Sequence, residues 1–290
     1  MLTIFSIPKA FHGHIDVIQR NAIQSWLRLY PPCEVILCGD DAGVAEVASE
    51  FGVRHLPDIT RNEYGTPLLS SAFARIQQVA QHRLICYVNA DIIFLSHLTA
   101  CIKRVAFQRF LMVGQRWDLV LTAPLDFQRQ DWEQRLMAQV SNHGILHPPS
   151  GSDYFVFPTD VMGHLPDFAV GRPGWDNWFI YRARTLGIPV IDVTDVNTVI
   201  HQNHDYSHIP HGSDGKSSEG PEADYNLNLV GGFDHVFTLE DATHLMTRHM
   251  LLPAWKPSHL RRVWRTLPIL RPETRTFVRF VDRLIQKAGS

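Results

Sequence analysis

Residues 84–94 read LICYVNADIIF, two apolar runs separated by a short turn. The run from Leu84 to Val88 has the aliphatic and aromatic character of a buried strand. Asn89 and Asp91 follow its last residue closely. Because ligands of parallel α/β sheets bind beyond the carboxyl ends of the strands, these two side chains are predicted to face a binding site.

The sequence before this stretch alternates between strand-like and helix-like segments. The apolar spacing predicts strands over residues 2–7, 34–38 and 53–56, and helices over residues 15–29, 44–51 and 68–81. This alternation favours an α/β fold with a mostly parallel central sheet and helices on both faces. The loops at the carboxyl ends of the first two strands contain Pro8, Lys9, Asp40 and Asp41.

The second half of the chain is less regular. Its apolar pattern predicts a strand over Ile92–Leu95, further strands over residues 110–113, 119–122, 154–157 and 189–193, and helices over residues 128–140 and 175–186. From His201 to Asp224 the chain is rich in His, Ser, Gly, Asp and Pro. Such a composition predicts a long loop, and long loops in compact domains often bind ligands or cover a site.

Composition excludes several classes of protein. The 290 residues include 27 Lys and Arg against 29 Asp and Glu, so a globally basic nucleic-acid binder is not expected. The 45% hydrophobic content argues against disorder. Four Cys form neither a disulfide framework nor a zinc knuckle, which indicates reduced thiols in a cytoplasmic protein. No apolar run is long enough to span a membrane, and the N-terminus lacks the pattern of a signal peptide.

The turn after Val88 resembles the Asp-x-Asp motif of the nucleotide-sugar glycosyltransferases of the GT-A fold. In that family the motif follows a strand of this kind and holds a divalent metal against the diphosphate of the donor. Here Asn89 replaces the first Asp of the motif. Asp91 stands at the position of the second, which is usually the direct metal ligand, so the resemblance implies a metal site at Asp91.

Three further segments carry the resemblance. Asp40 and Asp41 match the acidic loop that contacts the nucleobase or ribose. Gly151-Ser152-Asp153 resembles the glycine loop that approaches the sugars, where Asp153 would accept from hydroxyls. Residues 174–178, GWDNW, resemble the Trp-rich acidic motif in which a carboxylate serves as base in inverting members, and here Asp176 is the only carboxylate available.

Residues 201–204, HQNH, supply the fourth match, because many GT-A enzymes give a late His to the metal. His201 and His204 are the candidate ligands, and the His-rich stretch continues to His208 and His211. A zinc site built on these residues is the alternative, although structural zinc sites mostly use Cys. The second alternative is a solvated loop that binds no ligand.

The resemblance implies a glycosyltransferase that uses Mn²⁺ or Mg²⁺ and a nucleotide-sugar donor, most simply a UDP-sugar. A glycan or a lipid-linked acceptor, and with it polysaccharide biosynthesis, is the matching expectation. Lys9 and Arg61 are candidate cations for the donor phosphates, and Asp153 rivals Asp176 for contact with the acceptor. Retaining or inverting chemistry stays open. The expected division is a nucleotide-binding half (1–100) and an acceptor half (101–245), followed by a helical extension (246–290).

Three other functions compete with this interpretation. The replacement at Asn89 keeps open a degenerate GT-A domain that binds a sugar nucleotide or a glycan without turnover. A nucleotidyltransferase would carry a Gly-rich basic loop after the first strand, and residues 8–13, PKAFHG, have too few glycines for that. A zinc-dependent hydrolase built on the His-rich stretch would contain zinc when purified.

The C-terminal segment differs from the rest in charge. Residues 251–290 contain nine Lys or Arg and two Asp or Glu, which gives this segment a net charge of +7. Because the whole chain has a net charge of −2, the remaining residues carry −9. Pro268 and Pro272 predict two helices. In the second, basic and apolar side chains recur on different faces: Arg275, Arg279 and Arg283 against Phe277, Val281 and Leu284. Such a helix suits an anionic membrane surface, which would place the enzyme in the cytoplasm or peripherally at the inner face of the membrane. The alternative is a helix packed on the acidic body with its Arg side in water.

Overall fold

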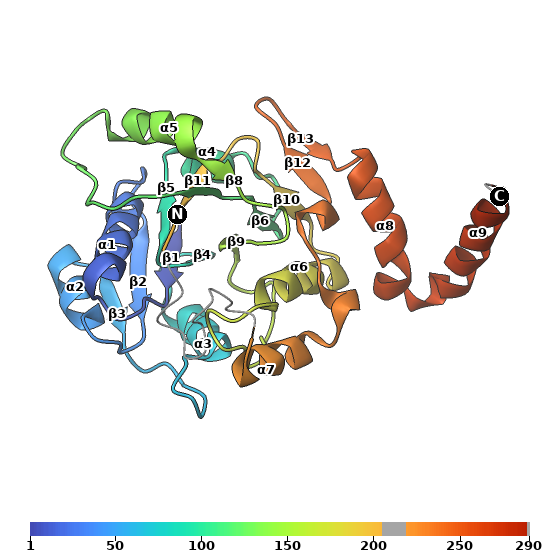
Figure 1. The fold of residues 1–290 in the computed structure, drawn as a ribbon, viewed down its shortest axis with the longest axis horizontal. Coiled ribbons are helices and arrows are strands. Elements are labelled where there is room, and N and C mark those ends of the chain that lie inside the picture. Colours follow the sequence, from blue (N-terminus) through green and yellow to red (C-terminus); the bar gives the residue numbers. More distant parts are fainter. Residues whose placement is uncertain (205–218, 289–290) are drawn as a thin grey trace.

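Two β-sheets organise the chain in the computed structural model, which describes residues 1–204 and 219–288 (Figure 1). The larger sheet has nine strands, in the order β13 (Leu251–Pro253), β12 (His244–Met246), β10 (Val190–Asp192), β6 (Leu111–Val113), β9 (Tyr154–Pro158), β4 (Leu84–Val88), β1 (Thr3–Ser6), β2 (Glu34–Cys38) and β3 (Arg54–Leu56). The strand that ends at Val88 is therefore central.

Most neighbouring strands of this sheet are parallel, as the alternating sequence predicts. β1 runs parallel to both β2 and β4, and β10 runs parallel to both β6 and β12. β9 is the reversed strand between β4 and β6. The carboxyl ends of β1, β2 and β4 consequently share one edge of the sheet, where ligands bind in such folds.

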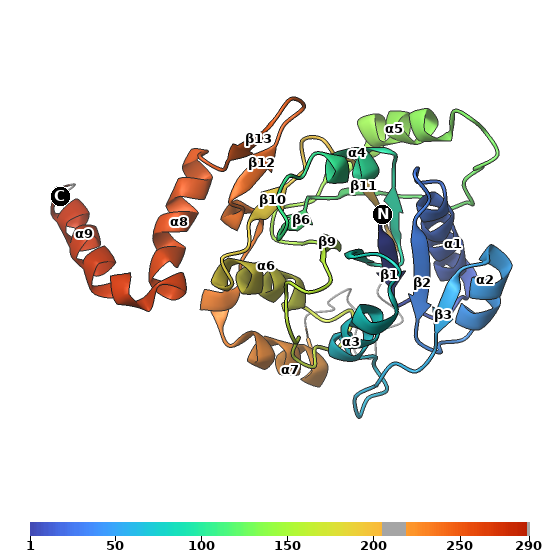
Figure 2. The ribbon, with the colours of Figure 1, turned by 180° about the vertical axis from the view of Figure 1, so that it is seen from behind.

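Helices cover both faces of the large sheet (Figures 1 and 2). The apolar side chains of α1 (Gly13–Leu27), α2 (Val44–Phe51) and α4 (His97–Lys103) pack on one face. Those of α3 (Leu69–Val79), α6 (Trp175–Thr185) and α7 (Pro221–Val230) pack on the other. Successive strand residues point to opposite faces, so both must be apolar, which explains the continuous apolar run of β4.

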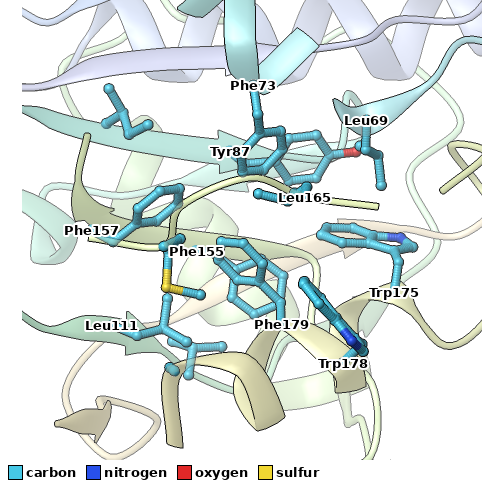
Figure 3. Close-up of a cluster of buried hydrophobic side chains, with 14 of the residues drawn as sticks. Leu69, Phe73, Tyr87, Leu111, Phe155, Phe157, Leu165, Trp175, Trp178 and Phe179 are labelled. Atoms are coloured by element: carbon cyan, nitrogen blue, oxygen red, sulfur yellow. The ribbon is translucent and has the colours of Figure 1, made fainter. Parts of the chain in front are cut away.

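One of these two cores is rich in aromatic side chains (Figure 3). Phe73 of α3 stacks on Tyr87 of β4, with ring centroids 5.7 Å apart. Trp175 meets Tyr87 edge-on at 4.9 Å. Phe179 of α6 packs edge-on against Phe157. This packing fixes the start of α6, with its Asp176, close to the end of β4.

The second sheet brings distant polar residues together. Its strand order is β5 (Ile92–Phe94), β11 (Val199–Gln202), β7 (Trp117–Leu119) and β8 (Ile145–Leu146), and α5 (Trp132–His143) packs on it. In its register His201 lies opposite Ile92 on one side and Asp118 on the other. The segment after Asp91 thus runs beside His201.

The predicted loop from His201 to Asp224 is wrong at both ends. His201 and Gln202 belong to β11, and α7 begins at Pro221. Gln202 is fully buried, and its Nε2 donates to the carbonyl of Ile18 at 2.7 Å, so its polar character did not mark a loop. Pro at the start of a helix, followed by acidic residues in the first turn, is the signal for α7. Residues 205–218, with His208 and His211, lie outside the described residues.

Other elements differ in place from the predictions. The strand predicted over residues 119–122 is β7, Trp117–Leu119, and α4, β12 and β13 were not predicted. The expected boundary at residue 245 falls inside β12, so the large sheet continues into the segment assigned to the extension. Two 3₁₀ turns, Phe233–His235 and Leu239–Asp241, precede β12.

The chain ends in two helices, α8 (Pro257–Leu270) and α9 (Arg275–Ala288), joined by the turn Pro272–Thr274. Pro268 lies in the last turn of α8 rather than between helices, where its missing N–H removes one helix hydrogen bond. Figures 1 and 2 show α9 standing clear of both sheets. Within the described residues, no helix combines the length and the apolar character needed to cross a bilayer.

Candidate functional site

A cavity of about 760 Å³ opens at the carboxyl ends of β1 and β4. This volume is within the range of small-molecule sites. Most of the predicted site residues line it: Pro8, Lys9, Asp41, Arg61, Asn89, Asp153, Asp176, His201 and His204. Asp40 and Asp91 are not part of the wall, but each contacts a residue that is, Arg61 and His204 respectively.

Asp91, His201 and His204 form a compact cluster of potential metal ligands. Asp91 Oδ2 lies 3.0 Å from His204 Nε2 and 3.6 Å from His201 Nε2, and one ligand atom from each residue falls within 4.8 Å of the others. Asp91 Oδ1 is buried and has no hydrogen-bond partner among the described residues. An unpaired carboxylate oxygen beside two imidazoles is a donor set that fits a divalent cation such as Mn²⁺.

The charges in this cluster are already balanced by ion pairing. Burial alone would raise the pKa of Asp91, but His201, His204 and Lys9 together hold it well below its usual value. Burial alone would lower the pKa of His201, but Asp91 and Asp118 raise it to about 10. The carboxylate is therefore ionised at neutral pH, as a metal ligand must be, whereas His201 carries a proton that a bound cation would displace.

Asp118 holds His201 from the side away from Asp91. The register of β7 and β11 sets the two residues side by side, and Asp118 Oδ1 lies 3.1 Å from His201 Nδ1. Asp118 also accepts from Arg116 Nε at 2.9 Å and contacts His147 Nδ1 at 2.9 Å. A carboxylate on Nδ1 leaves Nε2 of His201 directed at Asp91, the usual arrangement behind a metal-binding histidine.

Asn89 occupies a position where a carboxylate would be repelled. Its Nδ2 donates to Asp153 Oδ1 at 2.8 Å, and its Oδ1 accepts from the Tyr87 hydroxyl at 3.0 Å. Arg116 pairs with the other oxygen of Asp153. Both oxygens of Asp153 are thus engaged, and its side chain is 8% exposed. The amide at position 89 is complementary to this buried carboxylate, which an aspartate would not be.

Asn89→Asp is expected to lower the free energy of unfolding at pH 7 by about 1–3 kcal/mol, since it replaces a hydrogen bond by two facing carboxylates. Repulsion raises the pKa of the pair in the folded state, so the destabilisation appears above that pKa and shrinks as the pH falls. Urea unfolding of variant and wild type at pH 7 and pH 5 measures both effects. Asn142→Asp, at an exposed position, is the control. Equal stabilities at pH 7 would contradict the assigned contact.

Asp176 lies in the first turn of α6 and faces the cavity. The preceding Gly174 has φ +94°, and a Cβ there would lie 2.9 Å from Val230, so both the turn and the packing require glycine. Ser152 N–H donates to Asp176 Oδ2 at 3.3 Å. Burial raises the pKa of Asp176 to about 6, against opposing backbone hydrogen bonds. A carboxylate with that pKa is a competent base at neutral pH.

Cationic side chains also line the cavity. Arg61 donates to Asp40 through Nε at 3.1 Å and to Asp41 through Nη2 at 3.0 Å, which joins the β2 loop to residue 61. Asp40 is 65% exposed and Asp41 32%. Burial lowers the pKa of Lys9, and the nearby Asp91 opposes that effect. Gln19 fixes the backbone of Lys9 through two hydrogen bonds of 2.8 and 2.9 Å.

Several residues of the site were not predicted. Arg116 and Arg172 line the cavity, and Asp118 supports it from behind. Arg172 pairs with Glu222, which also accepts from Asn62 Nδ2 at 2.7 Å. Arg172 lies two residues before the GWDNW motif, and this proximity could have marked it as a site residue. Nothing local marks Asp118 as a site residue, because it reaches His201 only through the pairing of β7 with β11.

Comparison with known proteins relates the fold to solved structures. The scan of protein-family models and the search of curated proteins give no match. The crystal structure of GalNAc-T7 with UDP, GalNAc and Mn²⁺ aligns with a TM-score of 0.50 at 14% identity, over 80% of this chain and 48% of GalNAc-T7. The chain thus spans about half the length of that protein. Residues 1–349 of S. aureus TarS, in complex with UDP-GlcNAc, align with a TM-score of 0.50 at 11% identity, over 93% of this chain and 82% of the TarS chain. The mixed sheet with its flanking helices and these two alignments show that the chain has the GT-A fold of the nucleotide-diphospho-sugar glycosyltransferases.

Proposed function

We propose that this protein is a glycosyltransferase that moves a sugar from a nucleoside-diphosphate donor to a hydroxyl of a glycan or lipid-linked acceptor. The observation that carries the proposal is the convergence of Asp91, His201 and His204 at a cavity that also contains Asp176. GalNAc-T7 with UDP, GalNAc and Mn²⁺ and TarS with UDP-GlcNAc, which share the fold, support a UDP-sugar as donor. Polysaccharide biosynthesis in the cytoplasm is the matching process.

The donor phosphates would lie against the ligand cluster and Lys9. A bound Mn²⁺ or Mg²⁺ supplies positive charge that stabilises the departing diphosphate. Asp91, His201 and His204 would hold it, and Lys9 adds a cation that the protein keeps close to Asp91. Asp41, in the loop after β2, and Arg61, which donates to it, suit the hydrogen-bonding edges of the base and ribose. Asn89 and Pro8 would form the wall between these two regions.

Asp176 would act as the base on the acceptor. The acceptor oxygen forms a bond to the anomeric carbon, the bond from that carbon to the phosphate oxygen breaks, and the hydroxyl proton passes to the Asp176 carboxylate. Attack from the side opposite the leaving group inverts the configuration. The oxygens of Asp153 are engaged by Asn89 and Arg116, so we assign Asp153 to holding the sugar-facing loop 151–153 rather than to proton transfer.

The test is thermal stability against UDP-, GDP-, dTDP- and CMP-sugars, with and without Mn²⁺. A donor at about 100 times its dissociation constant adds ~2.7 kcal/mol to the stability of the folded state. Stabilisation by one nucleotide class that requires metal supports the proposal. No stabilisation at millimolar donor contradicts the donor site. Binding without transfer or hydrolysis of the donor favours the degenerate domain, and zinc in the purified protein favours the hydrolase.

Asp118→Asn is expected to weaken Mn²⁺ binding by about 10–100-fold, the usual effect of removing the carboxylate behind a ligating histidine. The reason is that an amide orients His201 less firmly and no longer raises its basicity. Mn²⁺ titration followed by electron paramagnetic resonance measures the affinity without any turnover. Asp160→Asn, at a side chain that is 66% exposed, is the matched control. Wild-type affinity in Asp118→Asn would show that Asp118 has no part in metal binding.

A further inference from the structure

The C-terminal helix pair, α8 and α9, exposes an apolar surface that nothing in the described part of the chain covers. Phe277 and Phe280 are each 59% exposed and Leu284 is 51% exposed. Their spacing of three and four residues sets them on one face of α9. On α8, Leu260 is 52% and Val263 40% exposed. Three large side chains aligned on one helix face differ from scattered surface apolar residues and mark an interaction site.

This surface is built on a firm attachment to the body. Arg262 of α8 donates to both carboxylate oxygens of Asp241, and the Asp241 side chain is fully buried. α9 is tied to α8 in turn, because Trp264 Nε1 donates to Asp282 Oδ1 at 2.8 Å. Val278 is buried at 5% exposure, on the inner side of α9. Phe277 also meets the Trp264 ring edge-on, with the ring centroids 6.3 Å apart, and still leaves 59% of its surface exposed. The exposure of Phe277, Phe280 and Leu284 is therefore a property of the folded protein.

The basic side chains lie on a different face of α9. Arg275, Arg279 and Arg283 are exposed and follow one another at intervals of four residues. Residues 251–290 as a whole carry +7. Of the two acidic residues among them, Asp282 is engaged by Trp264. An amphipathic helix with an apolar face and a cationic face binds the interface of an anionic bilayer. Its apolar face is buried among the lipids, and its cationic face is attracted to the acidic headgroups.

We propose that the C-terminal helix pair docks the protein on an anionic lipid surface. Charge decides between this occupant and a second copy of the chain, because a second copy would bring another segment of charge +7 against the first, whereas acidic headgroups neutralise that charge. Phe277, Phe280 and Leu284 enter the headgroup and acyl boundary, and the Arg side chains reach the lipid phosphates. A protein docked on a lipid surface would lie next to lipid-linked acceptors. That consequence rests on the proposed function.

Sedimentation of the full-length protein with vesicles tests the proposal, with phosphatidylcholine alone or mixed with phosphatidylglycerol. We expect binding only to the anionic vesicles, falling as salt shortens the screening length. Arg279→Glu/Arg283→Glu is expected to weaken binding at least about tenfold. Arg83→Glu/Arg109→Glu changes the net charge equally at exposed sites outside the helix pair and should leave binding unchanged. Phe280→Ser should also weaken it, and Phe233→Ser, at a 93% exposed residue, should not.

Two outcomes overturn the proposal. One is no binding to anionic vesicles at low salt. The other is binding that the α9 variants leave at the wild-type level. Light scattering in solution reports the alternative occupant, since a dimer that Phe280→Ser dissociates, without vesicle binding, identifies a second copy. Donor-induced thermal stabilisation, measured on the same samples without lipid, keeps the two proposals separate: vesicle binding can fail while donor binding stays, and the reverse.

Discussion

Asp91→Ala is expected to abolish the Mn²⁺-dependent part of donor stabilisation and to reduce sugar transfer by about 10³-fold or more, equivalent to ~4 kcal/mol of transition-state stabilisation. The reason is geometric. Asp91 provides the only carboxylate within the ligand cluster of the described residues, and one of its oxygens is buried without a partner among these residues. With two neutral imidazoles alone, the cluster would bind a divalent cation more weakly, and less positive charge would stabilise the departing diphosphate.

The measurement combines the thermal-shift panel with a transfer or donor-hydrolysis assay. Asp91→Asn accompanies the alanine variant, because it keeps the shape of the side chain and tests the charge alone. Asp160→Ala, at an exposed aspartate outside the cavity, controls for an unspecific loss of charge. If Asp91→Asn folds and still shows full metal-dependent donor binding, the cluster is not the metal site.

Asp176→Asn is expected to reduce turnover by about 10²–10⁴-fold while donor affinity stays near that of the wild type. An amide keeps the size of the carboxylate and its acceptor oxygen for the Ser152 N–H, but it cannot take a proton. The loss should therefore appear in kcat, with a small change in the KM for donor. Asn177→Ala is not a suitable control, since Asn177 Nδ2 holds the carbonyls of Ser150 and Phe237. Asp224→Asn, at an exposed position on α7, is the matched control.

The pH profile gives a second test of Asp176. The base must be ionised, and its pKa of about 6 predicts that kcat/KM is flat above that pH and falls tenfold per unit below it. In Asp176→Asn the residual activity should lack this limb. A profile of the variant that keeps the same limb would assign it to another group and remove Asp176 from the reaction.

Although Asp176→Asn is expected to lower activity, it should not lower the stability of the folded protein at neutral or higher pH. The folded-state pKa of Asp176 lies above the ordinary value of 3.8, so the folded state favours the protonated carboxyl. Its contribution to stability is complete below pH 3.8 and is lost as the pH rises through about 6. Asp176→Asn should thus unfold at a temperature equal to or above that of the wild type at pH 8. A gain in stability with a loss of activity is typical of a group kept for function.

Local sequence patterns were sufficient for much of the fold. The predicted bounds of β2, α2 and β4 match the structure, since each is a short apolar run or an amphipathic turn closed by Gly or polar residues. The position of Asn89 and Asp91 at a central strand end followed from the same patterns. The predicted loop from His201 failed at its start because the polar residues there are buried, as in Gln202 of β11. A hydrogen-bonded polar side chain and a solvated one look alike in a sequence.

Local sequence alone sets the alternation of strands and helices, the continuous apolar runs of strands that are buried on both faces, and the acidic and His side chains at the strand ends. Which of these side chains meet depends on how the elements pack. Asp118 reaches His201 through the pairing of β7 with β11, and Asn89 reaches Asp153 across β4 and β9. These contacts join residues more than 60 positions apart. The physical reason is that hydrophobic periodicity acts within one element, whereas strand register, which sets the contacts of a site, depends on how distant elements pack.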